Sequence, residues 1–370
     1  NIILIKMKKK SIPFYYIAEL NLPNKSAYSI HVMKMCEAFS KLGYEINLLS
    51  IKNTNLSKIL NAYNIKYRFN LISIFNKSLN LNFITRLLFT YKILIKTFKK
   101  NSVFISRSIV FALIASTIKK NVFLELHHQI TGFSKILFNF LKFFNLTKNL
   151  KFIFLHKKLK QFYNIKNSNS IILDDASDIN SFKSKIKKKK LKNTCVYIGS
   201  FFEGKGIEQI LRLAKLNEKI FFHIYGEKKY LMNRKIGKNI KVFDYVNYSK
   251  IPKILSQYEV ALMPYQSKVK GRSSLWLEKY MSPLKMFDYL AAKMIILASD
   301  LTVYSHILKN NFNCNLIKVN DDKKWSEALN NAFKNKKINI FLKKNAYATA
   351  QKYTWEKRCH KIIQFSKVKI

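Results

Sequence analysis

The sequence predicts an α/β protein built from two Rossmann-like domains that face each other across a cleft. The chain has 370 residues, which exceeds one ordinary domain and fits two cores. Apolar runs of strand length alternate with helical stretches through both halves, a pattern typical of parallel sheets. A nearly pure lysine stretch, residues 183–193, lies between the halves and indicates a solvated linker.

The first half opens as a βαβ unit, in which Gly43 ends the first helix before the second strand. We expect strands over 12–20, 45–50, 103–106 and 122–126, and helices over 29–42 and 109–118. Residues 1–182 therefore form the expected first domain.

The same alternation repeats after the linker, in an expected second domain of residues 194–340. The expected strands cover 195–199, 220–225, 240–244, 259–264 and 294–299, and the expected helices cover 206–217, 249–257, 283–292 and 323–335. A last helix is expected near 341–367.

Composition limits the classes of function. Hydrophobic residues make up 48% of the chain, so global disorder is not expected. The net charge of +48 comes mainly from lysine, and uniform enrichment in Lys, Asn and Ile indicates codon bias as much as selection for a polyanion. No zinc finger, RNP motif or Arg-rich helix supports a specific nucleic-acid partner, whereas an anionic membrane surface would attract such a chain.

The cysteines favour a reducing, cytoplasmic location. Cys36, Cys195, Cys314 and Cys359 are far apart and form no C-x-x-C pair, so we expect buried free thiols and no secretory signal. Met7, followed by three lysines, resembles a natural start. Every apolar run is interrupted before about 18 residues, so no spanning helix is expected.

Two amphipathic helices are candidates for a membrane surface. Residues 83–100 set an apolar face against basic side chains, and residues 133–144 place four phenylalanines around Lys135 and Lys142. Packing of the apolar face on the sheet is the ordinary explanation. An interfacial helix on an anionic leaflet is the functional alternative.

The most specific segment is 281–300. Ser282 and Pro283 open a helix, where proline loses no hydrogen bond, and Leu284 and Lys285 follow. Free N–H groups, the helix dipole and the lysine charge together favour an anion, most naturally a phosphate. The apolar run after the helix indicates a buried strand, so the segment predicts a nucleotide-type site in an α/β unit.

This segment resembles the nucleotide-sugar signature of the group 1 (family 4) glycosyltransferases, a retaining family of GT-B architecture. Residues 26–32, 197–207 and 353–358 resemble, in the same order, the family's first loop and helix, the loop opening its second domain and its closing helix. The resemblance implies a nucleoside-diphosphate-sugar donor, a hydroxyl acceptor, and no bound metal or cofactor. It also implies that a C-terminal helix within 341–370 packs back on the first domain.

Sugar transfer requires stabilisation of the diphosphate leaving group, for which positive charge is the main device. Lys205, between Gly204 and Gly206, and Lys285 are the candidate catalytic cations. The expected donor-binding residues are Gly199, Gly206, Ser282, Pro283, Leu284 and Asp288.

Some positions depart from the family pattern. The resemblance implies that Asp288, in place of the family's glutamate, accepts hydrogen bonds from the ribose hydroxyls of the donor. The alternative is that Asp288 is a mid-helix residue that faces solvent. Tyr280 stands where the family has a glutamate near the donor sugar, and Glu278 is a substitute. Ser200 replaces a common arginine, so Lys205, Lys285 or Arg272 must compensate.

In the first domain, His127 ends a strand and resembles the histidine of the family's Glu-x-His segment. Beyond a strand's carboxyl end it could contact the donor sugar or an acceptor hydroxyl, or it could simply bond to backbone. Ser26 and Ala27 form the small loop expected beside the diphosphate and the acceptor.

The sequence thus predicts a metal-independent, retaining glycosyltransferase acting on a surface glycan, with an acceptor that is lipid-linked and a peripheral site on the cytoplasmic face of the membrane. Two alternatives remain. One is a GT-B binding protein with weakened catalysis, and the other is a polyanion-binding protein.

Overall fold

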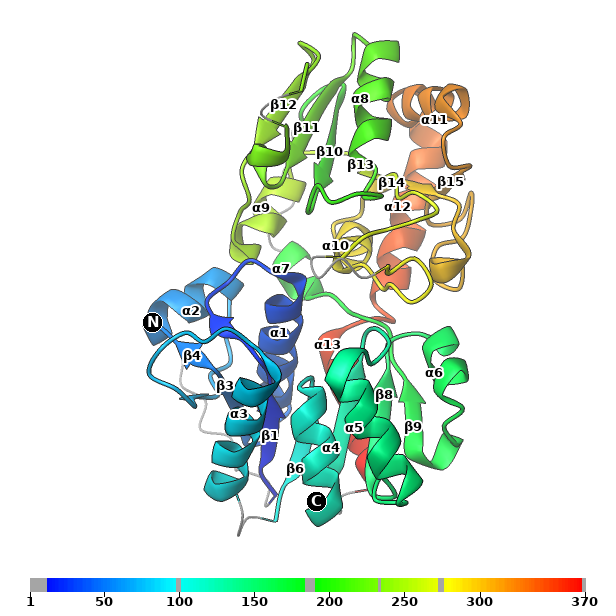
Figure 1. Cartoon of the computed structure of the whole chain (residues 1–370). Helices are drawn as coiled ribbons and strands as arrows, with labels where there is room; N and C mark the ends of the chain where they lie inside the picture. The colour runs from blue at the N-terminus through cyan, green and yellow to red at the C-terminus, as the bar shows by residue number, and fades with distance from the viewer. Residues whose placement is uncertain (1–11, 98–100, 184–189, 232–233, 272–275, 368–370) are drawn as a thin grey trace. The chain divides into compact units, whose positions relative to one another are not determined.

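The computed structural model describes residues 12–97, 101–183, 190–231, 234–271 and 276–367 (Figure 1). It divides into two compact units. The first takes the chain up to Asp174 together with the segment from Trp355 onward, and the second is Asp175–Thr354. None of the helices in the described part has the length and apolarity that crossing a membrane requires.

The first unit is a parallel sheet with the strand order β5-β3-β1-β6-β7-β8-β9 among the described residues. Its strands are β1 (Phe14–Ile17), β3 (Ile46–Ser50), β5 (Asn70–Ser73), β6 (Val103–Ser106), β7 (Val122–Leu126), β8 (Leu150–Phe154) and β9 (Ser170–Ile172), and β2 (Asn21–Leu22) pairs with β4 (Lys52–Asn53) beside it. The central strands are buried at every position, which explains their continuous apolar runs.

Helices cover this sheet in two sets. They are α1 (Ala27–Lys41), α2 (Leu56–Tyr63), α3 (Phe83–Thr97), α4 (Ile109–Ile118), α5 (Gly132–Phe143), α6 (Lys157–Tyr163) and α13 (Trp355–Ser366). Helix α1 packs against α13, while α4 packs against both α3 and α5 (Figure 1). The direction of strand addition reverses between β1 and β6, and ligands bind beyond the carboxyl ends of strands at such a point.

The second unit repeats this plan with the strand order β12-β11-β10-β13-β14-β15, all parallel. Its strands are β10 (Thr194–Ile198), β11 (Phe221–Tyr225), β12 (Ile240–Phe243), β13 (Val260–Met263), β14 (Ile295–Ser299) and β15 (Asn315–Ile317). Its helices are α7 (Ile179–Lys183), α8 (Ile207–Leu216), α9 (Ile251–Leu255), α10 (Leu284–Ala291), α11 (Asp322–Lys334) and α12 (Lys336–Ala350). The order reverses between β10 and β13.

The predicted fold class, an α/β protein with two Rossmann-like units, is confirmed. The boundaries differ from the expected 182 and 340 because residues 175–183 already pack in the second unit, where the Asp175 N–H donates to Ser282 Oγ (3.1 Å). The segment expected as one helix near 341–367 is two helices, α12 and α13. Between them residues 351–353 form a turn and a bend, and Thr354 pairs with Ser177 in an isolated bridge.

Other expectations concern residues outside the described part. Most of the lysine linker 183–193, the start at Met7 and the side chain of Arg272 belong to this group. The cysteines, in contrast, are described, and all four are buried free thiols.

Candidate functional site

Lys285 occupies the first turn of α10, and its ammonium group is buried. Its Nζ lies 3.6 Å from the centroid of the Tyr197 ring and 5.2 Å from that of Tyr265. No described residue offers this Nζ a hydrogen bond. Burial, and then the charge of Lys205, lower the pKa of Lys285 well below its usual range. A buried cation held only against aromatic rings indicates a site that accepts an anion.

Lys205 is the second cation of this group. It lies in the turn between β10 and α8, and its Nζ is 5.0 Å from the centroid of the Tyr265 ring that Lys285 also faces. Burial lowers the pKa of Lys205 to about 8. Among the described residues, no carboxylate forms an ion pair with either lysine, so both charges are available to a ligand.

Glycines make room for these lysines beyond the ends of β10 and β13, the switch point of the sheet. A Cβ built on Gly199 would lie 2.5 Å from Lys285 Nζ and 2.9 Å from its Cε. Gly206 has a φ of +90°, and a Cβ there would lie 2.0 Å from the carbonyl oxygen of Pro264. Both positions therefore require glycine if Lys285 and the turn are to keep their places.

The amino end of α10 adds backbone donors to the group. Pro283 is the cap residue and the helix begins at Leu284, one residue later than the sequence suggested. In the described part no side chain caps this end, and the Met286 N–H already donates to the Pro283 carbonyl oxygen at 2.9 Å. The N–H groups of Leu284 and Lys285 are therefore the first-turn donors left for a ligand. The Ser282 hydroxyl accepts the Asp175 N–H, which fixes the approach to the helix.

Asp288 lies one turn further along α10 and is buried, so the solvent-facing alternative does not hold. The hydroxyl of Tyr248 donates to its Oδ1 at 3.0 Å. This contact helps to hold the carboxylate in one orientation.

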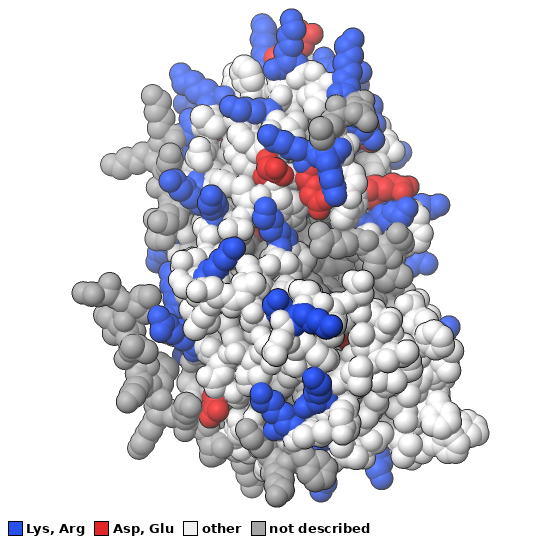
Figure 2. All heavy atoms as spheres, turned by 60° about the vertical axis from the view of Figure 1, so that its left-hand side comes forward, with Lys and Arg blue, Asp and Glu red and all other residues white. Residues whose placement is uncertain are grey.

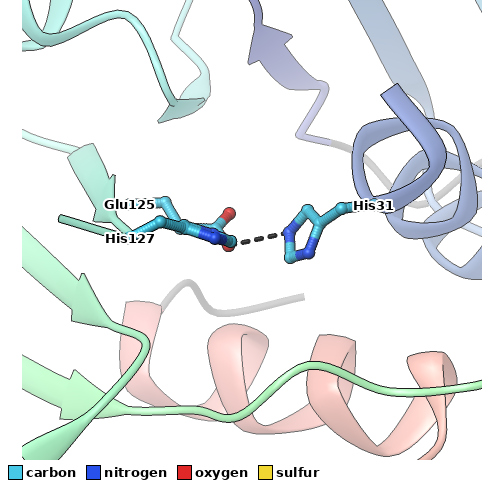
Figure 3. A group of neighbouring side chains, drawn as sticks. All are labelled: His31, Glu125 and His127. Atoms are coloured by element: carbon cyan, nitrogen blue, oxygen red, sulfur yellow. Dashed lines mark hydrogen bonds and ion pairs between the residues drawn. The ribbon is translucent and has the colours of Figure 1, made fainter. Parts of the chain in front are cut away.

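In the first unit, four polar side chains gather around Glu125 of β7, and Figure 3 shows two of them, His31 and His127, beside it. The Tyr16 hydroxyl donates to Oε2 at 2.6 Å, while Arg358 Nη2 lies 2.9 Å, His31 Nε2 2.7 Å and His127 Nε2 2.9 Å from Oε1. Burial alone would raise the pKa of Glu125, but Arg358 and His31 hold it well below its usual range. The carboxylate is therefore charged at neutral pH.

His127 has one nitrogen committed to this network. Burial, and then Arg107, lower its pKa to about 3, so the ring is neutral near pH 7. A carboxylate can only accept, so Nε2 carries the proton that His127 donates to Glu125. Its Nδ1 then keeps a lone pair.

The atoms of His31, Glu125 and His127 lie within 4.8 Å of one another, close enough to hold a metal ion. However, the Arg358 guanidinium and the Tyr16 hydroxyl already occupy both oxygens of the same carboxylate. A metal cation would have to displace a buried cation from its partner. The group therefore fits a hydrogen-bonded network better than a metal centre.

Comparisons with solved structures identify the fold. A glycosyltransferase from Rickettsia africae superposes with a TM-score of 0.71 at 14% identity, covering 96% of this chain and 98% of that one. Anabaena HepE in complex with UDP and glucose gives 0.71 at 10%, covering 97% and 100%. WaaG, a glycosyltransferase involved in lipopolysaccharide biosynthesis, gives 0.62 at 12%, covering 96% and 100%. At these identities the likeness establishes the GT-B fold alone.

A family model decides the identity. Residues 178–349 match the family described as glycosyl transferases group 1. These residues form a group 1 glycosyltransferase domain. The resemblance inferred from the sequence is thereby confirmed. No curated protein sequence matches the chain.

The group 1 domain contains most of the site residues expected from the sequence. Lys205, Lys285, Gly199 and Gly206 come together beyond β10 and β13, with Ser282, Pro283, Leu284 and Asp288 on or beside α10. Glu278, the substitute acid, accepts from the Val269 N–H at 3.4 Å, and Tyr280 is half-buried.

The remaining candidates lie in the first unit, outside the group 1 domain. His127 lies beside Glu125 as described, and Ala27 is the first residue of α1. Ser26 caps this helix, since its Oγ accepts the Ser29 N–H at 3.1 Å and donates to Asn24 Oδ1 at 2.6 Å. The Ser26 hydroxyl thus both accepts and donates a hydrogen bond within the loop and the first turn of α1.

Sequence reasoning missed several residues of these groups. Tyr197 and Tyr265 surround Lys285, and their positions at the ends of adjacent strands were a usable signal. His31 and Arg358 lay inside stretches matched to the family, but no local pattern links either residue to Glu125. Arg358 is 233 positions away from it.

Proposed function

We propose that this chain is a retaining glycosyltransferase that moves a sugar from a nucleoside-diphosphate donor to a hydroxyl of a lipid-linked surface glycan. The observation that carries the proposal is the buried, unpartnered ammonium of Lys285 beside Lys205. Two desolvated cations at a helix amino end suit a diphosphate, whose negative charge grows as the sugar leaves.

The proposed roles follow from this charge. Lys205, Lys285 and the N–H groups of Leu284 and Lys285 at the start of α10 hold the diphosphate, and Asp288 accepts hydrogen bonds from the ribose hydroxyls. The bond from the anomeric carbon to the phosphate oxygen breaks, and the acceptor oxygen bonds to that carbon on the same face. The leaving phosphate oxygen takes the acceptor's proton. The lysines supply the positive charge, so we expect no requirement for a metal.

His127 is proposed to contact the donor sugar or the acceptor hydroxyl through Nδ1, since its Nε2–H is directed at Glu125. The loop at Ser26 and Ala27 is proposed to border the diphosphate and acceptor. The fold shared with WaaG, named for lipopolysaccharide biosynthesis, supports a surface glycan as the acceptor. A lipid-linked acceptor would place the enzyme in the cytoplasm, on the inner face of the membrane.

Thermal-shift measurements with UDP, GDP, ADP and their sugar conjugates test the donor site, with pyrophosphate as the control. We expect one diphosphate to stabilise the protein more than the others, and one sugar to change that effect. Equal stabilisation by all ligands, pyrophosphate included, would mean that the lysines attract any anion without recognising a nucleotide. That result would favour a polyanion-binding protein. With the donor known, the anomeric configuration of the product by NMR tests retention, and activity in EDTA tests metal independence.

A weakened or lost transferase activity is a second candidate because of one observation. Tyr280 stands where the resemblance places a glutamate near the donor sugar, and the nearby Glu278 accepts a backbone N–H. A binding protein of this kind would be stabilised by a nucleoside diphosphate but would transfer no sugar. Introducing Tyr280→Glu distinguishes the two. Sugar transfer by Tyr280→Glu but not by the unmodified chain would support the hypothesis of a binding protein. Sugar transfer by the unmodified chain would exclude that hypothesis.

A further inference from the structure

Helix α5 turns an apolar stripe away from its own sheet. Its inward stripe is Ser134, Phe138 and Leu141. The opposite stripe consists of four residues at helical spacing that are between 56% and 83% exposed, namely Phe133, Ile136, Phe140 and Phe143. One face of α5 therefore packs in the core of the unit, and the residues of the second apolar face are largely exposed.

Helix α3 repeats this arrangement. Phe89, Thr90, Ile93 and Thr97 face inward, whereas Ile84, Leu88, Tyr91 and Ile95 are between 48% and 66% exposed. The exposed residues recur at intervals of four, three and four, which places them on one face. The expectation that this apolar face packs on the sheet is therefore not met by α3.

The two stripes belong to one surface, which we call the α3–α5 face. The rings of Phe83 and Phe133, near the starts of the two helices, lie 5.4 Å apart between centroids. Helix α4 packs against both helices (Figure 1). Figure 2 shows a broad area without charged side chains on this unit at the lower right, with basic side chains (blue) near its margin. A contiguous apolar surface of this kind marks an interaction site.

The exposed charged side chains of α3 and α5 are basic. Lys92 and Lys96 are exposed on α3, and Lys135 and Lys142 are exposed on α5. Glu125 is the only acidic residue between Glu45 and Asp174, and it is buried. The face therefore combines large apolar side chains with positive charge and no exposed carboxylate nearby in the sequence.

We propose that the α3–α5 face docks on an anionic lipid bilayer, with the phenylalanine stripe of α5 and the α3 stripe inserted at the level of the acyl chains. Exposed aromatic and aliphatic side chains flanked by lysine are the pattern of interfacial helices. A second copy is a poor occupant, since two such faces would bring like charges together. The choice of a lipid surface also rests on the proposed function, whose acceptor is lipid-linked.

Vesicle co-sedimentation with the full chain tests the docking. We expect binding to vesicles containing phosphatidylglycerol and little binding to phosphatidylcholine alone. The double variant Phe140→Ser/Phe143→Ser should lower the apparent affinity at least about tenfold, as expected for two inserted rings. The matched control Phe162→Ser/Phe221→Ser removes two exposed phenylalanines elsewhere and should bind like the unmodified chain.

Two outcomes would overturn the proposal. The first is unchanged vesicle binding by the α5 variant, which would leave only non-specific lysine attraction. The second is a dimer, seen by light scattering, that the same variant converts to a monomer, since the face would then join two copies. UDP-induced stabilisation, measured on every variant, keeps the docking separate from the donor site. A variant that loses vesicle binding but is still stabilised by UDP has lost only membrane docking. A variant that binds vesicles but is not stabilised by UDP has lost only the donor site.

Discussion

Replacing Lys285 by methionine should stabilise the unliganded protein while it removes donor binding. Methionine keeps the length of the stem and deletes the ammonium. A buried, unpaired ammonium costs several kcal/mol, of which the contact at 3.6 Å to Tyr197 returns about 2 kcal/mol. Removal of repulsion from Lys205 adds to the gain. We therefore expect the free energy of unfolding to rise by about 1–3 kcal/mol.

The assay compares melting temperatures with and without donor. In a unit of this size each kcal/mol corresponds to about 2–4 °C, so Lys285→Met should melt roughly 2–12 °C higher than the unmodified chain. The further stabilisation by the nucleoside diphosphate should disappear, and kcat/KM should fall by about 10²-fold or more. Lys241→Met is the control, because Lys241 is exposed and also lies over a ring, that of Phe243, at 5.3 Å.

Two results would refute this reasoning. A lower melting temperature for Lys285→Met would mean that the ammonium has a stabilising partner in the unliganded protein. Retained diphosphate stabilisation would mean that Lys285 does not contact the donor. The opposite signs of the two expected effects make the test sharp, since a generally damaged variant would lose both stability and binding.

Three further predictions concern neighbouring features. Gly199→Ala should weaken UDP binding about tenfold or more by calorimetry, because its Cβ would lie 2.5 Å from Lys285 Nζ and displace the charge. The affinity for UDP should fall by about tenfold per pH unit above pH 8, because Lys205 has a pKa of about 8 when free and must be protonated in the complex; Lys205→Arg should flatten this dependence. Glu125→Gln should lower the free energy of unfolding by about 3–5 kcal/mol at pH 7, because it leaves Arg358 buried without a counter-charge. The folded carboxyl has a lowered pKa, so its contribution is present above its unfolded pKa and is lost as pH falls through the folded value. Urea titrations should therefore show the deficit of Glu125→Gln narrowing in acid, and a deficit independent of pH would contradict the assignment.

The sequence predicted most of the strands that are continuous apolar runs, although β8, a largely buried run, and the short β9 were missed. The runs that became β3, β7, β10 and β14 are buried at nearly every position, so their composition alone identifies them. The edge strands β5 and β15 were not predicted, because their half-exposed residues lack a continuous apolar run. Lys205 and Lys285 could be predicted for a similar reason, because each belongs to a short motif of neighbouring residues in the sequence.

Contacts made only by tertiary packing could not be read in this way. Periodicity shows that α3 and α5 each carry an apolar stripe, but it cannot show which of two stripes faces the sheet. The network around Glu125 depends on residues brought together from α1, β1, β7 and α13. No spacing in the sequence connects these elements.

The return of α13 to the first unit has a consequence for synthesis of the chain. Arg358, whose guanidinium bonds to Glu125, is translated after the whole of the second unit. While the ribosome is still making residues 175–354, the nascent first unit must hold a buried carboxylate without its guanidinium partner. We infer that the second unit can finish folding first, and that the amino-terminal unit closes only when the last helix emerges. A fragment ending at residue 174 would therefore stay a partly folded intermediate.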